Sequence, residues 1–419
     1  MSAKLQLFMN QLCGWSAVAL VFSAPFSRAL YILSGLLFVI GWCTQNDLRG
    51  RLIKIKSLAI TPPALSIMAM VLIWSTWSPA PSGDVFNNIK VYSKMLLLLM
   101  LVSTFSDPLW RRRGWWGFTA GMALVLTSTL ANIVIDLPWS KSQNQGLGVD
   151  HSVFVEYVSQ SVMTAVFLAF TIQRTWAAKE ARTRITWGGV SLLALCSVMF
   201  LLQGRSGLVA SAIVMAVMTF IHTPPARRWL AFLLMVLAFT LLVMSSPLML
   251  ERVQQGYKEV IEHEAFSLTS LGLRMDMWLL ALNNFWENRL LGTGVGTYHQ
   301  IAATHFSRFE AANLMYMVIH PHNQYLFFAV EYGIAGLMVF CWFLWRLAKT
   351  AYFSANPERS ILFATTAVLA VDSLFNVPMW YRAESYFFYA TLGLLLASNL
   401  SAQSKEAHQS LRADNLMKS

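Results

Sequence analysis

Long apolar runs, separated by short polar segments, make up most of the chain. A run of about 20 apolar residues is long enough to cross the hydrocarbon core of a bilayer as a helix. Twelve runs are expected to do so, near residues 11–24, 27–45, 57–76, 88–106, 115–135, 152–173, 185–203, 207–222, 229–246, 322–345, 360–377 and 384–400. The first run is short and Pro25 follows it, so the first two runs are alternatively one re-entrant hairpin.

One polar segment, residues 247–321, is much longer than the others. Residues 249–263 and 273–287 have the apolar spacing of amphipathic helices, and 298–317 are expected to be helical as well. The fold class is therefore all-α, a polytopic membrane bundle of about 12 transmembrane helices with one large helical loop. The expected organisation is nine spans in residues 1–246, the loop in 247–321, three spans in 322–400 and a disordered tail in 401–419.

The composition supports a membrane protein. Hydrophobic residues make up 56% of the 419 positions and charged residues only 12%, whereas soluble proteins carry roughly 25% charged residues. Mean hydropathy is +0.53. The net charge of +11 is spread over short loops that alternate along the chain, which is a topology signal, and no nucleic-acid partner is expected.

The positions of the lysines and arginines predict the orientation. If the N-terminus is cytoplasmic, every inner segment is basic, and both termini lie inside. Residues 247–321 then form a loop on the outer side of the membrane. The first run lacks a small-residue cleavage site after it and is expected to be a retained helix. The inner basic residues are Lys4, Arg49, Arg51, Lys54, Lys56, Arg111, Arg112, Arg113, Arg174, Lys179, Arg182, Arg184, Arg227, Arg228, Arg346, Lys349, Arg359, Lys405, Arg412 and Lys418.

The sequence does not indicate a metal site or a nucleotide-binding site. The four cysteines all lie in apolar runs, without metal-ligand or disulfide spacing. The outer segments contain no Asp-x-Asp motif and no His/Cys cluster, so no metal and no cofactor are expected. Gly292, Gly294 and Gly296 resemble a dinucleotide fingerprint, but they follow no strand of a parallel sheet, which argues against nucleotide binding.

Three polar motifs are expected on the outer side. Arg205 lies in the small-residue turn 203–207, Arg274 lies on a helix of the long loop, and the loop ends in His320-Pro321-His322-Asn323. Arginine offers a planar, permanently charged fork that matches phosphate oxygens, and histidine exchanges protons near neutral pH. Each motif also has a purely structural explanation. An arginine at a helix end often snorkels to the interface, and His320 alternatively caps the incoming helix.

Four further polar residues are ambiguous. Lys90 and Lys94, one helical turn apart, are secondary phosphate contacts or snorkelling side chains. Asn323 either binds substrate or satisfies the start of the following helix. Asp372, within an apolar run, is expected to make a structural hydrogen bond.

Taken together, these motifs resemble the family of bacterial O-antigen ligases and polymerases. The shared pattern is the arginine turn, Arg-x-x-x-Trp in the loop, Gly-x-Gly-x-Gly, and His-x-His-Asn-x-Tyr-Leu opening the next span. Glu-x-Gly-x-x-Gly follows, here Glu331 to Gly336. The resemblance covers about residues 195–345, while the flanking spans fit in number and hydropathy.

The resemblance implies a membrane glycosyltransferase that uses an undecaprenyl-diphosphate-linked glycan as donor. It also implies the inner membrane of a bacterium as the location, with residues 247–321 as a periplasmic loop. It fits an O-antigen ligase, which joins the finished glycan to a sugar hydroxyl of lipid A–core in lipopolysaccharide assembly. The alternatives are an O-antigen polymerase and a protein O-oligosaccharyltransferase. The large loop before the histidine motif favours the ligase over the polymerase. The short tail argues against the oligosaccharyltransferase, which usually has a C-terminal soluble region.

In the implied reaction Arg205 and Arg274 hold the diphosphate. His322 is the general base, with His320 as the second choice, and the other substrate-binding candidates are Asn323, Lys90 and Lys94. In-line attack predicts inversion at the anomeric carbon. The rival from another class is a transporter or flippase of lipid-linked glycan, which favours charged residues at mid-membrane; here the central runs are nearly free of charge.

Overall fold

The computed structural model describes residues 3–262, 269–307 and 319–398, and these residues contain helices and no strand. The first seven helices come from the N-terminal third of the chain. They are α1 (Ala3–Ser23), α2 (Arg28–Cys43), α3 (Leu48–Ser57), α4 (Thr61–Ser75), α5 (Ser82–Tyr92), α6 (Lys94–Phe105) and α7 (Pro108–Ala131).

The remaining helices follow a loop of residues 132–156. They are α8 (Tyr157–Ala177), α9 (Ala181–Phe200), α10 (Arg205–His222), the short 3₁₀ helix η1 (Pro225–Arg227), α11 (Arg228–Met244), α12 (Pro247–Ile261), α13 (Ser270–Glu287), α14 (Thr297–Ser307), α15 (Gln324–Phe353) and α16 (Arg359–Asp372). Residues 382–398 form a further helix. The all-helical fold class is thus confirmed.

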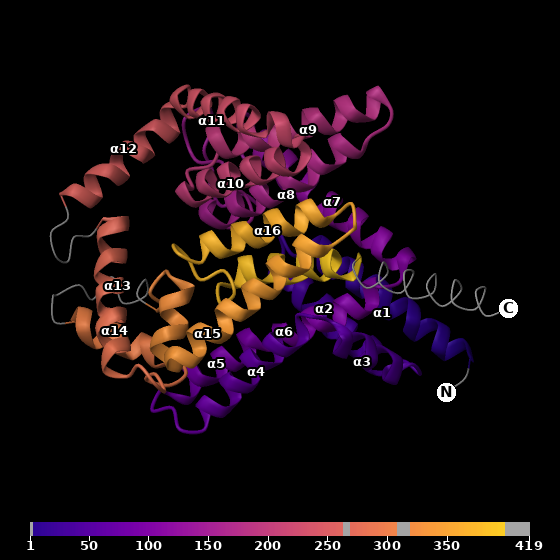
Figure 1. Ribbon diagram of the computed structural model, residues 1–419, viewed down its shortest axis with the longest axis vertical. Coiled ribbons are helices and arrows are strands. Elements are labelled where there is room, and N and C mark those ends of the chain that lie inside the picture. The colour runs from indigo at the N-terminus through magenta and orange to yellow at the C-terminus, as the bar shows by residue number, and fades with distance from the viewer. Residues whose placement is uncertain (1–2, 263–268, 308–318, 399–419) are drawn as a thin grey trace.

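The helices form two groups with a central layer between them. Figure 1 shows α15, α16 and the helix of residues 382–398 between α1–α6 on one side and α8–α11 on the other. In agreement, α15 packs against both α4 and α16, and α16 packs against α8 and α10. The loop helices α12, α13 and α14 lie together at one end of the bundle, and α13 and α14 contact α15 there.

Each of the twelve expected spans coincides with a helix, and α5 and α6 together form one of them. Six stretches of the described residues are long and apolar enough to cross a membrane by themselves, or seven if α2 and α3 count as one span bent by 111°. Part of the difference from twelve arises because α2, α4 and α16 have only 16, 15 and 14 residues, which is short for a span.

The helices of the long loop begin at side-chain caps that the sequence supplies. Ser246 accepts a hydrogen bond from the Met249 N–H at the start of α12, and Thr269 accepts one from the Gly272 N–H at the start of α13. The helix α12 confirms the expected 249–263 helix as far as Ile261, with residue 263 outside the described part, and α13 confirms the expected 273–287 helix. The expected helix 298–317 begins as α14, its last ten residues lie outside the described part, and so does the expected tail 401–419.

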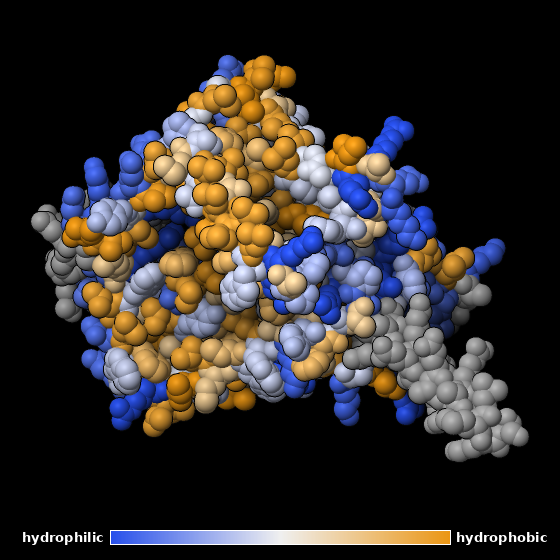
Figure 2. All heavy atoms as spheres, turned by 45° about the horizontal axis from the view of Figure 1, so that its top comes forward, coloured by the Kyte–Doolittle hydropathy of each residue, from blue (hydrophilic) through white to orange (hydrophobic). Residues whose placement is uncertain are grey.

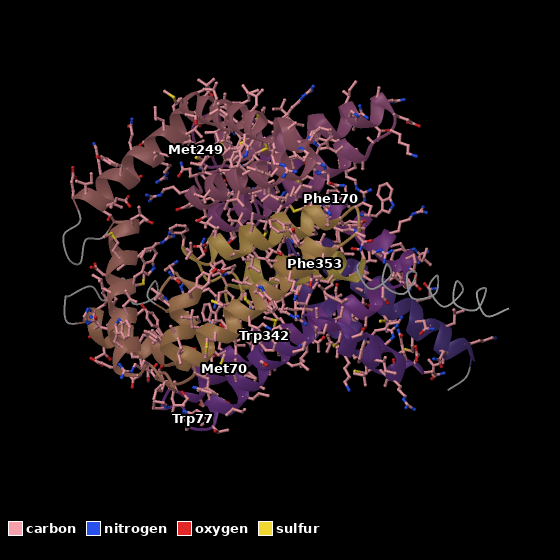
Figure 3. The ribbon with its side chains drawn as sticks, viewed as in Figure 1. Met70, Trp77, Phe170, Met249, Trp342 and Phe353 are labelled. Carbon is pink, nitrogen blue, oxygen red and sulfur yellow. The ribbon has the colours of Figure 1, made fainter. Side chains whose placement is uncertain are left out.

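The surface has the pattern of a protein in lipid. Figure 2 shows hydrophobic residues gathered over the middle of one face, with hydrophilic residues towards its left and right sides. The apolar helix α11 has no buried residue, and Leu233 and Leu237 are more than half exposed. Figure 3 places Trp77 towards the end that carries α13 and α14, whereas Phe353 lies well away from it. An apolar surface of this extent fits contact with lipid.

The basic segments that were predicted to share one side meet at the end opposite to α12–α14, here called the basic end. Arg111, Arg112 and Arg174 line one cavity there, and Arg228 and Arg359 line another. These arginines lie near the ends of four different helices, α7, α8, α11 and α16, so the tertiary structure agrees with the alternation of charge along the chain.

The helix α15, which is kinked at Gly333, binds the glycine turn of residues 292–296. In α15, the carbonyls of Val330 and Glu331 accept hydrogen bonds from the N–H groups of Thr293 and Gly294, at 2.8 and 3.1 Å. The Gly296 N–H donates to the Glu331 Oε1 at 2.9 Å. The Gly-x-Gly-x-Gly turn therefore uses these N–H groups to bind a helix, which agrees with the argument against nucleotide binding.

Two glycines allow the backbone of this turn to approach the backbone of α15 closely. Gly333 has a φ of +67° inside α15, and a Cβ there would lie 2.4 Å from the Leu290 carbonyl oxygen. Gly292 has a φ of +71°, and its Cβ would lie 2.5 Å from the backbone of Glu331. Both positions combine a left-handed backbone with space for hydrogen only.

Candidate active site

A cavity of about 300 Å³ opens at the end of the bundle that carries α12–α14. Its wall combines the start of α8, the helix α13, the turn before α15 and residues 376–384. Three of the predicted site residues, Arg274, His320 and His322, line it. The other lining residues are Glu156, Tyr157, Val158, Ser159, Thr269, Ser270, Leu273, Met277, Asn376, Val377, Tyr381 and Glu384.

Arg274 is the central cation of this cavity. Burial on α13 lowers its pKa, and repulsion from the nearby Arg205 lowers it further, whereas Tyr157, Asp372 and Glu259 oppose these two effects. Arg274 forms no hydrogen bond or ion pair with the other described residues. Arg274 is partly exposed and lines the cavity, so its guanidinium is well suited to bind an anionic ligand that enters the cavity.

Arg205 is held next to Arg274 by its turn and by an ion pair. It is the first residue of α10. A Cβ on either Gly204 or Gly207 would collide with Ser161 of α8, so only small residues let this turn approach α8. The Arg205 Nη2 lies 3.3 Å from the Oε2 of Glu259 on α12. Arg205 does not line the cavity, and it acts on Arg274 through its charge.

Two further hydrogen bonds connect the Arg205 turn to its surroundings. The Glu259 Oε2 also accepts from the backbone N–H of Leu271, at 2.9 Å, which ties α12 to the start of α13. The Asn376 Nδ2 donates to the Ser206 Oγ at 3.1 Å, which ties the turn to the cavity wall. The turn, α12, α13 and the segment after α16 thus form one connected unit.

The two histidines differ in environment and in role. His320 is 3% exposed and packs edge-on against Trp380, and burial lowers its pKa to about 3. Its neutral Nδ1 lies 3.4 Å from the backbone N–H of His322, which it accepts as a hydrogen bond. His322 is half-buried on the cavity wall and has a φ of +48°, a conformation that side chains rarely adopt. His320 therefore supports the turn that presents His322.

The remaining predicted site residues lie away from the cavity wall. The Asn323 Oδ1 accepts a hydrogen bond from the Leu326 N–H, so Asn323 is the N-cap of α15. The Lys94 Nζ donates to the Ser385 Oγ at 2.7 Å and lies over the Tyr386 ring. Lys90 does not line the cavity either. Their substrate contacts stay predictions, and the structure gives Asn323 and Lys94 other partners.

Acidic residues at the cavity were missed by the sequence reasoning. The Glu384 Oε1 accepts a hydrogen bond from the Ser159 Oγ at 2.9 Å, and Glu384 lines the cavity together with Glu156. Asp372, for which a structural hydrogen bond was expected, accepts one from the Asn376 Nδ2 at 2.7 Å. A signal for Glu384 was present in the sequence, because a lone carboxylate at the end of an apolar run often marks a functional position in membrane proteins.

This arrangement has a definite chemical capacity. A guanidinium binds phosphate oxygens, a half-exposed imidazole accepts a proton, and carboxylates accept hydrogen bonds from sugar hydroxyl groups. Among the residues that the structure describes, no group of three or more His, Cys, Asp or Glu is placed to hold a metal ion.

Residues 190–341 match the family model described as O-antigen ligase. The chain contains an O-antigen ligase family domain. Members of this family are membrane glycosyltransferase-type enzymes, and the apolar helices identify the chain as a membrane protein. A comparison with curated proteins gave no match.

The O-antigen ligase domain supplies only part of the cavity. Arg205, Arg274, His320 and His322 all lie within the matched residues. The acidic and phenolic part of the wall, with Glu156, Tyr157, Asn376, Tyr381 and Glu384, comes from residues before and after the match. The cavity is thus completed by helices that flank the O-antigen ligase domain.

Proposed function

We propose that this protein is an O-antigen ligase, which transfers a glycan from undecaprenyl diphosphate to a sugar hydroxyl of lipid A–core. One observation carries the proposal: Arg274 and His322 line the same cavity, with Arg205 beside Arg274. A cation for the leaving group and a base for the attacking group are the two functions that such a transfer requires.

In the proposed reaction, the acceptor oxygen attacks the anomeric carbon, and the bond from this carbon to the diphosphate oxygen breaks. The diphosphate leaves with the bonding electron pair, and Arg274 and Arg205 neutralise its growing charge. No general acid is required because a diphosphate is a good leaving group. Attack from the opposite face inverts the anomeric configuration.

His322 takes the proton of the acceptor hydroxyl in this scheme. It is preferred over His320 because it is partly exposed at the cavity, whereas the low pKa of His320 makes that ring a poor proton acceptor at neutral pH. The backbone turn that His320 supports fixes where the His322 ring lies.

The carboxylates fit this proposal as sugar ligands. Glu384 and Glu156 lie on the same wall as Tyr381. Carboxylates repel a diphosphate, so they are expected to face the sugar rather than the phosphate groups. The cavity wall thus offers both the Arg274 guanidinium and the carboxylates of Glu156 and Glu384.

The deciding experiment combines purified protein, a lipid-diphosphate-linked glycan and lipid A–core in detergent micelles. A joined product supports ligation and excludes a purely vectorial transporter. Elongated lipid-linked glycan without joined product identifies a polymerase instead, and glycan transfer to a pilin-like protein identifies a protein O-oligosaccharyltransferase. Full activity in excess chelator supports a metal-independent reaction, whereas loss that Mg²⁺ restores overturns it.

We also propose that the cavity faces the periplasm of a bacterial inner membrane and that both termini are cytoplasmic. The proposal rests on the basic end, since cytoplasmic loops are enriched in lysine and arginine. A phosphatase that is active only in the periplasm, fused after Ser246, should be active. A fusion after Arg184 serves as the control and should be inactive. The reverse pattern overturns the orientation.

A further inference from the structure

One cavity at the basic end has no part in the proposed transfer. It has a volume of about 640 Å³ and lies between α10, α11, α15 and α16. Most of its lining is apolar, and two arginines, Arg228 and Arg359, complete it. The remaining lining residues are Ala216, Val217, Phe220, Ile221, Ala351, Tyr352 and Phe363.

The two arginines are the first residues of two different helices. Arg228 begins α11 and Arg359 begins α16. Neither forms an ion pair with another described residue, and no aspartate or glutamate is among the residues that line this cavity. The Arg228 Nε is buried and has no hydrogen-bond partner in the described part of the chain. The cavity therefore carries uncompensated positive charge and an unsatisfied donor.

The packing of α11 indicates which kind of ligand fits this cavity. Among the described helices, α11 packs against α10, η1 and α12, whereas it has no comparable contact with α15 or α16. The cavity lies in this gap. It joins apolar walls to a pair of cations at one end, which is complementary to an amphiphile with an anionic head and hydrocarbon chains.

We propose that this cavity binds an acidic membrane phospholipid from the leaflet at the basic end. Arg228 and Arg359 bind the oxygens of its phosphate group from two sides, and the Arg228 Nε–H gains an acceptor. The acyl chains cover Val217, Phe220 and Phe363 and fill the gap beside α11. The lipid thereby links α11 to α16. Its binding does not depend on the glycan transfer proposed above.

The test uses the full chain in a neutral detergent. Thermal unfolding and native mass spectrometry are measured after addition of cardiolipin or phosphatidylglycerol, of zwitterionic phosphatidylcholine, or of inorganic phosphate alone. We expect a bound acidic lipid and an increase in Tm of several degrees, which phosphatidylcholine and phosphate do not reproduce. An equal increase with phosphatidylcholine, or with inorganic phosphate alone, overturns the proposal.

Variants locate the site. Arg228→Gln and Arg359→Gln should each weaken acidic-lipid binding about tenfold, as expected for one lost charge-assisted hydrogen bond. Arg227→Gln is the matched control, because the exposed Arg227 does not line the cavity, and its lipid affinity should equal that of the wild type. Unchanged binding in both cavity variants contradicts the proposal.

A further cavity variant leaves the charge unchanged. Ala216→Phe fills the cavity while both arginines remain. It should abolish the lipid-dependent increase in Tm and leave the Tm of the lipid-free protein within a few degrees of the wild type. A full lipid response in Ala216→Phe places the lipid elsewhere and overturns the proposal. A ligation assay on the same samples separates this site from the candidate active site, because loss of lipid binding should not abolish glycan transfer in micelles.

Discussion

The Arg205 guanidinium lies 3.3 Å from the Glu259 carboxylate, and the same carboxylate oxygen accepts the backbone N–H of Leu271. One acidic side chain therefore fixes an arginine from the α9–α10 turn and the start of the helix that carries Arg274. The two arginines repel each other, so the compensating charge on Glu259 helps to keep them close.

The first prediction concerns this pair. Glu259→Gln keeps an acceptor for the Leu271 N–H but removes the charge that orients Arg205, so the KM for the lipid-linked donor should rise about tenfold with little change in Tm. Glu259→Ala also leaves the N–H unsatisfied and should cost a further 1–3 kcal/mol, approximately, in unfolding free energy. Kinetics and thermal unfolding of both variants measure the difference. Equal Tm values for the two variants contradict the dual role.

Arg274→Lys and Arg205→Lys test whether the two-pronged hydrogen bonding of a guanidinium is needed to bind the diphosphate. A lysine retains the charge but makes no two-pronged contact, so each variant should lose about 10- to 100-fold in kcat/KM, as expected for one lost charged hydrogen bond. Arg289→Lys is the control and should behave as the wild type, because Arg289 is exposed and lies in the same loop as Arg274. Full activity of both lysine variants reduces the arginines to a diffuse positive charge.

His322→Ala tests the base. Loss of a general base should lower the transfer rate by about 10²–10⁴ while the protein still folds and binds donor. His299→Ala serves as the control, because His299 is paired with Asp84 at 3.3 Å and does not line the cavity. The rates are measured with saturating acceptor. A near-wild-type rate for His322→Ala removes this residue from the proposed role.

The low pKa of the buried His320 predicts that the unfolding free energy depends on pH. Burial lowers its folded-state pKa to about 3, whereas the unfolded value is about 6.5. Between these values the unfolded chain binds the proton and the folded chain does not. The stability that the neutral ring contributes is therefore complete above about pH 6.5 and is lost as the pH falls, by about 1.4 kcal/mol per pH unit.

The variant His320→Gln isolates this effect, because glutamine does not titrate. The difference in Tm between wild type and His320→Gln should shrink or reverse from pH 7 to pH 5. A difference that stays constant over this range shows that His320 already titrates normally in the folded state.

Gly333→Ala tests the kink that fixes the glycine turn. The Cβ would lie 2.4 Å from the Leu290 carbonyl oxygen and would sit on a left-handed backbone. We expect a loss of about 2 kcal/mol or more in unfolding free energy together with reduced activity. In Gly189→Ala the new methyl group meets open space on a helix, so stability should rise by about 0.5–1 kcal/mol. A stable, active Gly333→Ala protein argues that the kink is unimportant.

The sequence alone determined the helices, the side on which the basic loops gather, and the residues of the polar motifs. These features are local: a span follows from about 20 consecutive apolar residues, and a motif is read within one short segment. Even the role of Asn323 as a helix cap was among the alternatives, because a cap depends on residues three positions apart.

Only the tertiary structure decided how these segments combine. Glu384 and Glu156 come from distant parts of the chain, and their place beside Arg274 depends on how α8, α13 and residues 376–384 pack. The pairing of Arg205 with Glu259 and the burial that separates His320 from His322 likewise arise from long-range packing. Proximity and burial set charge and proton affinity, and neither quantity is encoded in the spacing of residues along one helix.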